Sequence, residues 1–398
     1  MVWVSSLISS FLKIQSLMWR GDELGLIMLW SLLWVLLVVS VTCRGCSIYT
    51  LMSSTFVSLF YLTSSWLALY FFYELAMLPI LVMIVINSSK PERFLASQFL
   101  LFYTVFCSFP LLIVIMFFLN GTGLGLFMPM VYLIPTPLKE LTLLAFMVKY
   151  PLFFLHNWLL KAHVEASLEG SMFLAGALLK LGPYGLIQLF LVMSFNKLFL
   201  FMVVSISLMG SVASAILSVF SVDLKLSVAY SSVSHMNMGI AGSVIFSMSA
   251  YWGVIGMIVA HSFASCVLFF MVTLAYELTG SRSPILIKGS FKSSPPLSFL
   301  GASSWLSNLN VPPFLGFVGE LMVFMGLMKY SFVFSVFLCL YGVLGGFYCL
   351  LLYFIQCESK SSHTYGFNPC HANLVGFMVG LTPQLLLFLM SSLILSID

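Results

Sequence analysis

Residues Leu144–Gly170 read LAFMVKYPLFFLHNWLLKAHVEASLEG. The run begins as an apolar helix, but Lys149 lies in its middle and Pro151 follows two residues later. A charged side chain is costly at the centre of a membrane helix, and proline removes a helical hydrogen bond and kinks or breaks the helix. The stretch therefore predicts a broken membrane helix with an ionisable group beside the break.

The composition of the whole chain agrees with a membrane location. The 398 residues are 61% hydrophobic and only 7% charged, with a mean hydropathy of +1.12. A soluble domain carries about 25% charged residues, so this chain is predicted to be a polytopic membrane protein. A net charge of +4, with basic residues scattered through short loops, does not indicate a nucleic-acid partner.

The hydropathy pattern predicts an all-α fold, because no regular ten-residue segments alternate with the period of a β-barrel. Membrane spans need about 20 apolar residues. Twelve are predicted, at residues 24–42, 48–64, 66–86, 94–118, 141–158, 170–193, 198–220, 227–247, 251–276, 299–328, 331–356 and 373–396. Residues 1–19 are either a thirteenth span or an interfacial helix. We therefore predict an N-terminal segment at 1–23 and one transmembrane domain at 24–398.

Loop charges predict the orientation of the chain. Alternating spans place nine basic residues on one side and five on the other, and the richer side is expected to face the cytoplasm or matrix, with both termini outside. The richer side holds Arg44, Lys90, Arg93, Lys161, Lys225, Arg282, Lys288, Lys292 and Lys360. The other side holds Lys13, Arg20, Lys139, Lys197 and Lys329.

Six ionisable residues fall inside predicted spans, where each charged group costs about 2.5–3.5 kcal/mol and four together on the order of 10 kcal/mol. One Lys–Glu pair can be a structural clamp, and one buried histidine is commonly a hydrogen-bonded core residue. Acid and base groups spread over six spans are instead typical of a proton relay. The six are Glu74, Lys149, Lys180, His235, His261 and Glu320.

A second predicted span, 299–328, is interrupted by Pro312 and Pro313 close to Glu320. Interrupted helices survive at membrane depth only where protein or a hydrated cavity surrounds them. Paired interrupted segments in two halves of a chain point to inverted repeats with a site between them. We predict repeats at about 48–193 and 198–356, followed by a C-terminal helix at about 373–396.

Other motifs do not predict a metal or cofactor site. His156 and His163 are spaced to share a helical face, but HEXXH is absent, so both are predicted to line or cap the helix after the break. The CRGC motif of Cys43–Cys46 has no second pair. We predict that this chain itself binds no metal and no cofactor.

Five motifs closely resemble the antiporter-like membrane subunits of respiratory complex I. They are MVKYPLFFLHNWLLKAHVEASLEGSMFLAGALLKLGPYG, DLKLSVAYSSVSHM, HSFASCVLFF, YELTGSR and NLNVPPFLGFVGE. The resemblance implies a proton-pumping module of the mitochondrial inner membrane. It implies that Glu74 pairs with Lys149, that Lys180 passes the proton through His235 or His261, and that Glu320 is the exit group.

The same resemblance implies the partners. NADH, FMN, iron–sulfur clusters and ubiquinone are expected in other subunits, so no redox chemistry is expected in this chain. Its neighbours are expected to be other complex I membrane subunits, with the antiporter-like chains 2 and 5 beside it, and membrane lipids. Two alternatives remain: a subunit of a multi-chain sodium/proton antiporter, and a structural spacer in which the ionisable residues are dispensable.

Overall fold

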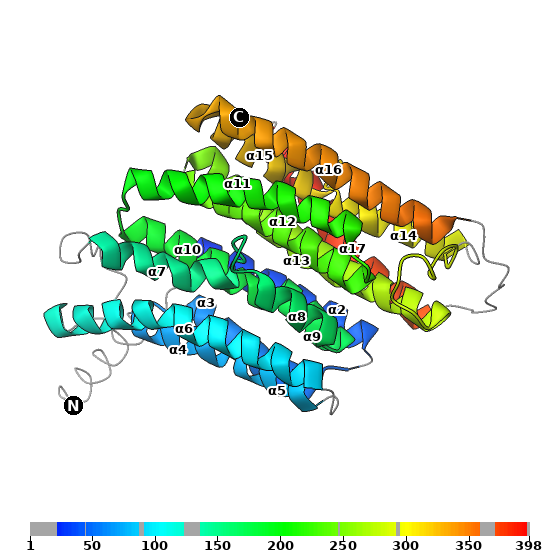
Figure 1. Ribbon diagram of the computed structural model, residues 1–398, viewed down its shortest axis with the longest axis horizontal. Coiled ribbons are helices and arrows are strands. Elements are labelled where there is room, and N and C mark those ends of the chain that lie inside the picture. Colours follow the sequence, from blue (N-terminus) through cyan, green and yellow to red (C-terminus); the bar gives the residue numbers. More distant parts are fainter. Residues whose placement is uncertain are drawn as a thin grey trace, which may run out of the picture.

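The computed structural model describes residues 22–43, 45–86, 91–122, 136–245, 247–291, 295–358 and 371–395. Within these ranges the chain is helical and contains no β-strand, as predicted. The predicted segment 1–19 and the loop residues Lys13, Arg20, Arg44, Lys90, Lys292 and Lys360 lie outside the described residues. The helices run side by side along one common direction (Figure 1).

The described elements are α2 (Glu23–Thr42), α3 (Ile48–Leu62), α4 (Trp66–Leu75), α5 (Leu78–Ile86), α6 (Pro91–Thr122), α7 (Thr136–Lys149), α8 (Asn157–Glu165), α9 (Leu168–Gly176), the 3-10 turn η1 (Leu178–Lys180), α10 (Leu181–Val192), α11 (Lys197–Phe220), α12 (Leu224–Ile245), α13 (Met248–Thr279), α14 (Pro295–Asn308), α15 (Leu315–Tyr330), α16 (Phe332–Cys357) and α17 (His371–Leu395).

Local sequence signals set several helix ends. The side chains of Ser47, Ser167, Asn196 and Ser247 each accept a hydrogen bond from a backbone N–H of the helix that follows. Such caps satisfy donors that a helix start leaves without partners. Gly280 ends α13 in the left-handed region with φ of 70°, where it has no Cβ to clash.

Seven helical segments among the described residues are long and apolar enough to cross a membrane. Two shorter apolar helices, Ile48–Leu62 and Gly376–Leu389, add to them. The spans predicted at 141–158 and 299–328 fall short because each is divided into two short helices. The fold is thus that of a helical membrane protein, and the total of twelve or thirteen spans stays a prediction.

The outside of the bundle exposes many apolar side chains, and polar side chains are buried among the apolar ones of its interior. Phe106, Phe220 and Val343 are exposed, whereas α12 carries five buried serines together with His235 and Asn237. Exposed apolar area on this scale marks a surface that meets lipid or other chains. The buried polar groups mark the interior as the place where the chemistry lies.

Two central helices, α12 and α13, connect the halves of the molecule. Figure 1 shows them between α7–α10 on one side and α14–α16 on the other, and both groups contact them. Close packing of α13 on α15 depends on glycine: a Cβ on Gly253 would lie 2.7 Å from the Val323 nitrogen, and one on Gly319 would lie 2.8 Å from the Met257 nitrogen. Small residues of this kind let membrane helices approach closely, and here they hold α15, the helix that carries Glu320, against α13.

Candidate functional site: a buried line of acid and base groups

Four charged residues lie at interruptions of helices. Glu74 stands near the end of α4, Lys149 is the last residue of α7, Lys180 ends the turn η1, and Glu320 lies in the second turn of α15. Two of these interruptions, at Pro151 and at Pro312–Pro313, are the predicted ones. The interruptions beside Glu74 and Lys180 were not predicted.

Proline explains the two additional interruptions. Pro79 comes four residues after Leu75, the last residue of α4, and Pro183 comes three residues after Lys180, the last residue of η1. Neither proline has an N–H, so the carbonyls of Leu75 and Leu179 lack the usual helical partner. The signal was therefore present in the sequence. It is not sufficient alone, because Pro110 lies inside the continuous helix α6.

The first break is closed by polar contacts from its own chain and from α12. The Leu152 N–H donates to the Met147 carbonyl at 3.0 Å, which gives that oxygen a partner one residue later than in a regular helix. The side-chain amide of Asn237 donates to the Pro151 carbonyl and accepts from the Phe153 N–H, both at 3.0 Å. Gly239 makes room, since a Cβ there would lie 1.7 Å from the Tyr150 hydroxyl oxygen.

Lys149 is fully buried and is held by Tyr73. Its ammonium donates to the Tyr73 carbonyl and lies 3.1 Å from the centroid of the Tyr73 ring. The implied direct pairing with Glu74 is not formed: within the described part of the chain no ion pair joins them, and Glu74 Oε1 is buried without a hydrogen bond.

The second half of the site begins at Lys180. Its Nζ lies 2.7 Å from Nδ1 of His261, and both side chains are buried. The rings of His261 and His235 follow with centroids 5.8 Å apart. The two histidines, which the resemblance offered as alternatives, are thus arranged in series.

Beyond His235 the line reaches Glu320 through Tyr341. The Tyr341 hydroxyl lies 2.6 Å from His235 Nδ1 and donates to Glu320 Oε1 at 3.2 Å. The direct distance from His235 Nδ1 to Glu320 Oε1 is 3.6 Å. Asn310, in the second break, donates to the same oxygen at 2.7 Å.

The structure thus arranges the six predicted residues in one series, but direct hydrogen bonds do not join all of its members: among the described residues none links Glu74 to Lys149, and none links the rings of His261 and His235. Within the described residues no hydrogen bond joins the side chains of Lys149 and Lys180, although the Lys149–Tyr150 backbone packs against Gly182. Four of the six are almost completely buried, whereas Glu74 and Glu320 at the two ends are only partly buried. Such an arrangement can hold and transfer protons between neighbouring groups.

Sequence reasoning missed three polar residues of the site: Asn237, Asn310 and Tyr341. Asn237 lies two residues after His235, and Asn310 stands directly before the interrupting segment, so their positions were a usable signal. Tyr341 lies in a long apolar helix with no motif around it. Only the packing of α16 on α15 identifies it.

The two histidines after the first break take no part in the line. His156 is the cap residue of α8 and stacks on Phe153, with centroids 4.9 Å apart. His163 is fully buried and stacks on Phe269 at 4.7 Å. Within the described chain no group of three or more His, Cys, Asp or Glu residues could hold a metal ion.

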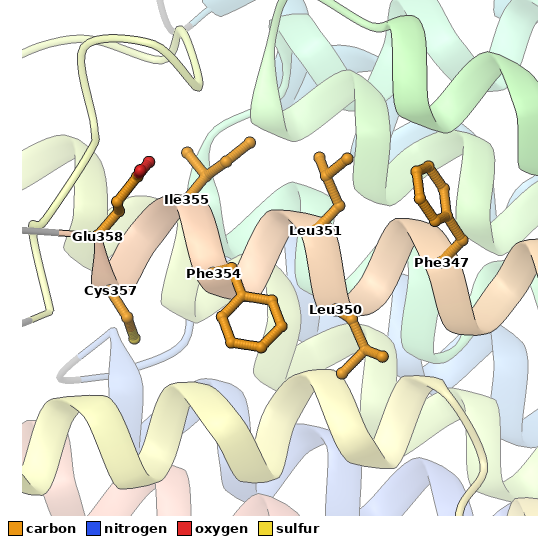
Figure 2. A pocket seen from close by; sticks show the side chains of 7 residues that line it. All are labelled: Phe347, Leu350, Leu351, Phe354, Ile355, Cys357 and Glu358. Carbon is orange, nitrogen blue, oxygen red and sulfur yellow. The ribbon is translucent and has the colours of Figure 1, made fainter.

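A surface groove on α16 lies away from the line of ionisable groups. It has a volume of about 620 Å³ and is lined mainly by apolar side chains, with Glu358 at one end (Figure 2). Glu358 forms an ion pair with Lys288 at 3.5 Å. The groove therefore brings no further titratable group to the site.

Broken helices around a buried series of acid and base groups are features of membrane proteins that translocate ions or protons. A family model described as "NADH:quinone oxidoreductase/Mrp antiporter, TM" matches residues 63–345. The chain belongs to this family of antiporter-like membrane subunits.

Particular relatives agree with this assignment. NADH-ubiquinone oxidoreductase chain 4 of Lumbricus terrestris is 35% identical over 301 residues, which are 74% of this chain and 67% of that one. In fold, the chain is similar to a chain of respiratory complex I from Thermus thermophilus, with a TM-score of 0.84, 19% identity and coverage of 92% and 81% of the two chains. It is also similar to a chain of the Mrp complex from Dietzia sp., with a TM-score of 0.83, 17% identity and coverage of 95% and 82%.

Proposed function

We propose that this chain is the chain 4 type of core membrane subunit in respiratory complex I of the mitochondrial inner membrane. It translocates protons through the line of buried groups, driven by electron transfer from NADH to ubiquinone in other subunits. The observation that carries the proposal is the buried series from Lys180 through His261 and His235 to Glu320. Hydrogen bonds join Lys180 to His261 and join His235 through Tyr341 to Glu320, and the two histidine rings lie with centroids 5.8 Å apart.

Each group has a proposed role. Glu74 controls the proton affinity of Lys149, because an approaching carboxylate stabilises the ammonium and a retreating one destabilises it. Lys180 passes the proton laterally to His261 and His235. Glu320, at the partly exposed end of the line, releases it.

The proposed architecture is twelve or thirteen spans with two inverted repeats, at about 48–193 and 198–356. It is supported by the two predicted breaks, one in each proposed repeat, and by a left-handed non-glycine residue in each break, Phe154 and Asn310. The matrix is proposed to lie on the side that is richer in basic loops.

The proposed partners follow from the relatives. NADH, FMN, iron–sulfur clusters and ubiquinone belong to other subunits, and the antiporter-like chains 2 and 5 are proposed as neighbours. Glu320 supports the chain 4 type. The chain 2 and chain 5 relatives generally have a lysine at the position of Glu320, whereas this chain resembles chain 4 in having a glutamate there.

A sodium/proton antiporter subunit is the second candidate, supported by the fold similarity to the Mrp complex. It predicts sodium-dependent proton movement without NADH. A structural spacer predicts that Lys149 is dispensable. Sodium dependence therefore distinguishes the antiporter from the proposed function, and pumping without Lys149 distinguishes the spacer from it.

The test is NADH oxidation and proton pumping in membranes carrying Lys149→Ala, with assembly of the complex measured on the same sample. Lys161→Ala is the matched control, because Lys161 is an exposed lysine on α8 of the same broken span. We expect the first variant to assemble and lose pumping while the second keeps it. Normal pumping by assembled Lys149→Ala contradicts the proposal and supports the spacer.

A further inference from the structure

The shortest hydrogen-bonded path between His235 and Glu320 passes through a residue outside the predicted relay. N–H···O hydrogen bonds span about 2.7–3.2 Å, and the direct distance from His235 Nδ1 to Glu320 Oε1 is 3.6 Å. Both atoms lie closer to the Tyr341 hydroxyl, at 2.6 Å and 3.2 Å respectively. The phenol therefore bridges the imidazole and the carboxylate.

Tyr341 is held in this position. Its side chain is 3% exposed, and its ring meets that of His235 edge to face, with an interplanar angle of 84° and centroids 5.8 Å apart. A hydroxyl has one donor and two acceptor lone pairs. It can therefore accept a hydrogen bond from the imidazole while it donates one to the carboxylate.

We propose that Tyr341 is a catalytic residue of the relay, whose hydroxyl transfers the proton between His235 and Glu320; this rests on the proposed function. The Nδ1–H bond of protonated His235 breaks as a new O–H bond forms at the phenol oxygen. The original phenol O–H bond breaks at the same time, and that proton binds Glu320 Oε1. The products are neutral His235, intact tyrosine and neutral Glu320, and the hydroxyl rotates back before the next transfer.

Tyr348 shows what a structural tyrosine of the same helix looks like. It lies seven residues after Tyr341, is also buried, and its hydroxyl accepts from Asn308 Nδ2 at 3.0 Å. Neither His235 nor Glu320 is among its hydrogen-bond partners in the described chain. Tyr348→Phe therefore removes a buried hydroxyl of the same kind without removing the bridge.

The experiment measures protons pumped per NADH, and complex assembly, for Tyr341→Phe and Tyr348→Phe. Losing a group that transfers a proton costs about 10²-fold or more. Water can replace the hydroxyl in part, so we expect pumping by assembled Tyr341→Phe to fall about tenfold, with Tyr348→Phe close to the parent. Unchanged pumping by assembled Tyr341→Phe overturns the proposal.

Two further variants keep the outcome interpretable. Glu320→Gln separates the two proposals: if it abolishes pumping while Tyr341→Phe does not, only the role of Tyr341 is wrong, and if both pump normally the relay itself is wrong. Should Tyr341→Phe not assemble, Tyr341→His supplies another ring that can both donate and accept a proton. Pumping above the Glu320→Gln level in assembled Tyr341→His supports the role, and pumping at that level overturns it.

Discussion

Asn310 combines a backbone role and a side-chain role at the second break. Its φ of 54° is in the left-handed region, which asparagine tolerates better than most residues. Its amide donates to Glu320 Oε1 at 2.7 Å and so fixes the carboxylate that Tyr341 contacts. Two substitutions can separate these roles.

Asn310→Gly and Asn310→Ala both delete the hydrogen bond to Glu320, but only alanine adds left-handed strain of about 1–2 kcal/mol. We therefore expect both variants to lower pumping equally, and Asn310→Ala to lower the thermal stability of the complex further than Asn310→Gly does. Pumping is measured as the pH change per NADH, and stability as the midpoint of thermal dissociation. Normal pumping in Asn310→Gly would show that the amide does not position Glu320.

At the scale of elements, α12 supports the first break across the boundary between the halves. Asn237→Ala leaves the Pro151 carbonyl and the Phe153 N–H without their partner, at a cost of about 1–3 kcal/mol for each buried group. We expect faster hydrogen exchange of the amides at 150–156, measured by mass spectrometry of the assembled complex.

Ser243→Ala is the control for Asn237→Ala. Ser243 is buried on the same helix, and its hydroxyl donates to the Ile240 carbonyl of that helix. Equal exchange rates in the two variants would mean that Asn237 does not hold the break.

Glu169 joins the start of α9 to the start of α3. Its Oε1 accepts from the Ser47 N–H and from the Thr50 hydroxyl, both at 2.6 Å. A carboxylate at two helix N-termini also gains from both helix dipoles, by about 0.3–1 kcal/mol at each end. Glu169 is thus a structural clamp between these helices.

Glu169→Gln keeps an acceptor oxygen and loses the charge, whereas Glu169→Ala loses both. We expect Glu169→Ala to destabilise the protein by about 1.5–3 kcal/mol, as for hydrogen bonds to a charged group, and Glu169→Gln by about half as much. The dissociation midpoint of the detergent-solubilised complex measures both. Equal losses would assign the whole effect to the charge.

At the scale of the whole molecule, the line from Lys180 to Glu320 depends on helices from distant parts of the chain. Lys180 and His261 are 81 residues apart in sequence, and His235 and Tyr341 are 106 apart. Groups that act as a unit give strongly non-additive effects when removed together.

Lys180→Ala and Glu320→Gln are therefore expected to lower pumping by similar factors, and the double variant by no more than the stronger single one. Pumping per NADH in assembled complexes of all three variants gives the comparison. A double variant whose loss is the product of the single losses would place the two residues on independent paths.

The class of fold and the ionisable residues follow from the amino-acid sequence alone. Apolar runs of this length predict membrane spans. A charged side chain such as Lys149 or Glu320 within such a run has a high free-energy cost of insertion, so its presence indicates a functional site. The effect of proline on a helix can also be read from the sequence, because proline lacks the backbone N–H in any conformation. The breaks at Pro151 and Pro312–Pro313 could thus be predicted, and the interruptions near Pro79 and Pro183 were open to the same argument.

Which of these groups contact one another depends on how the helices pack together. Lys149 contacts the Tyr73 carbonyl and ring and not Glu74, and the path from His235 to Glu320 runs past Tyr341. These contacts join residues on different helices, and their distances depend on how closely the helices pack. Local sequence sets the period and ends of a helix, but the glycines between α13 and α15 have their effect only once both helices are in place.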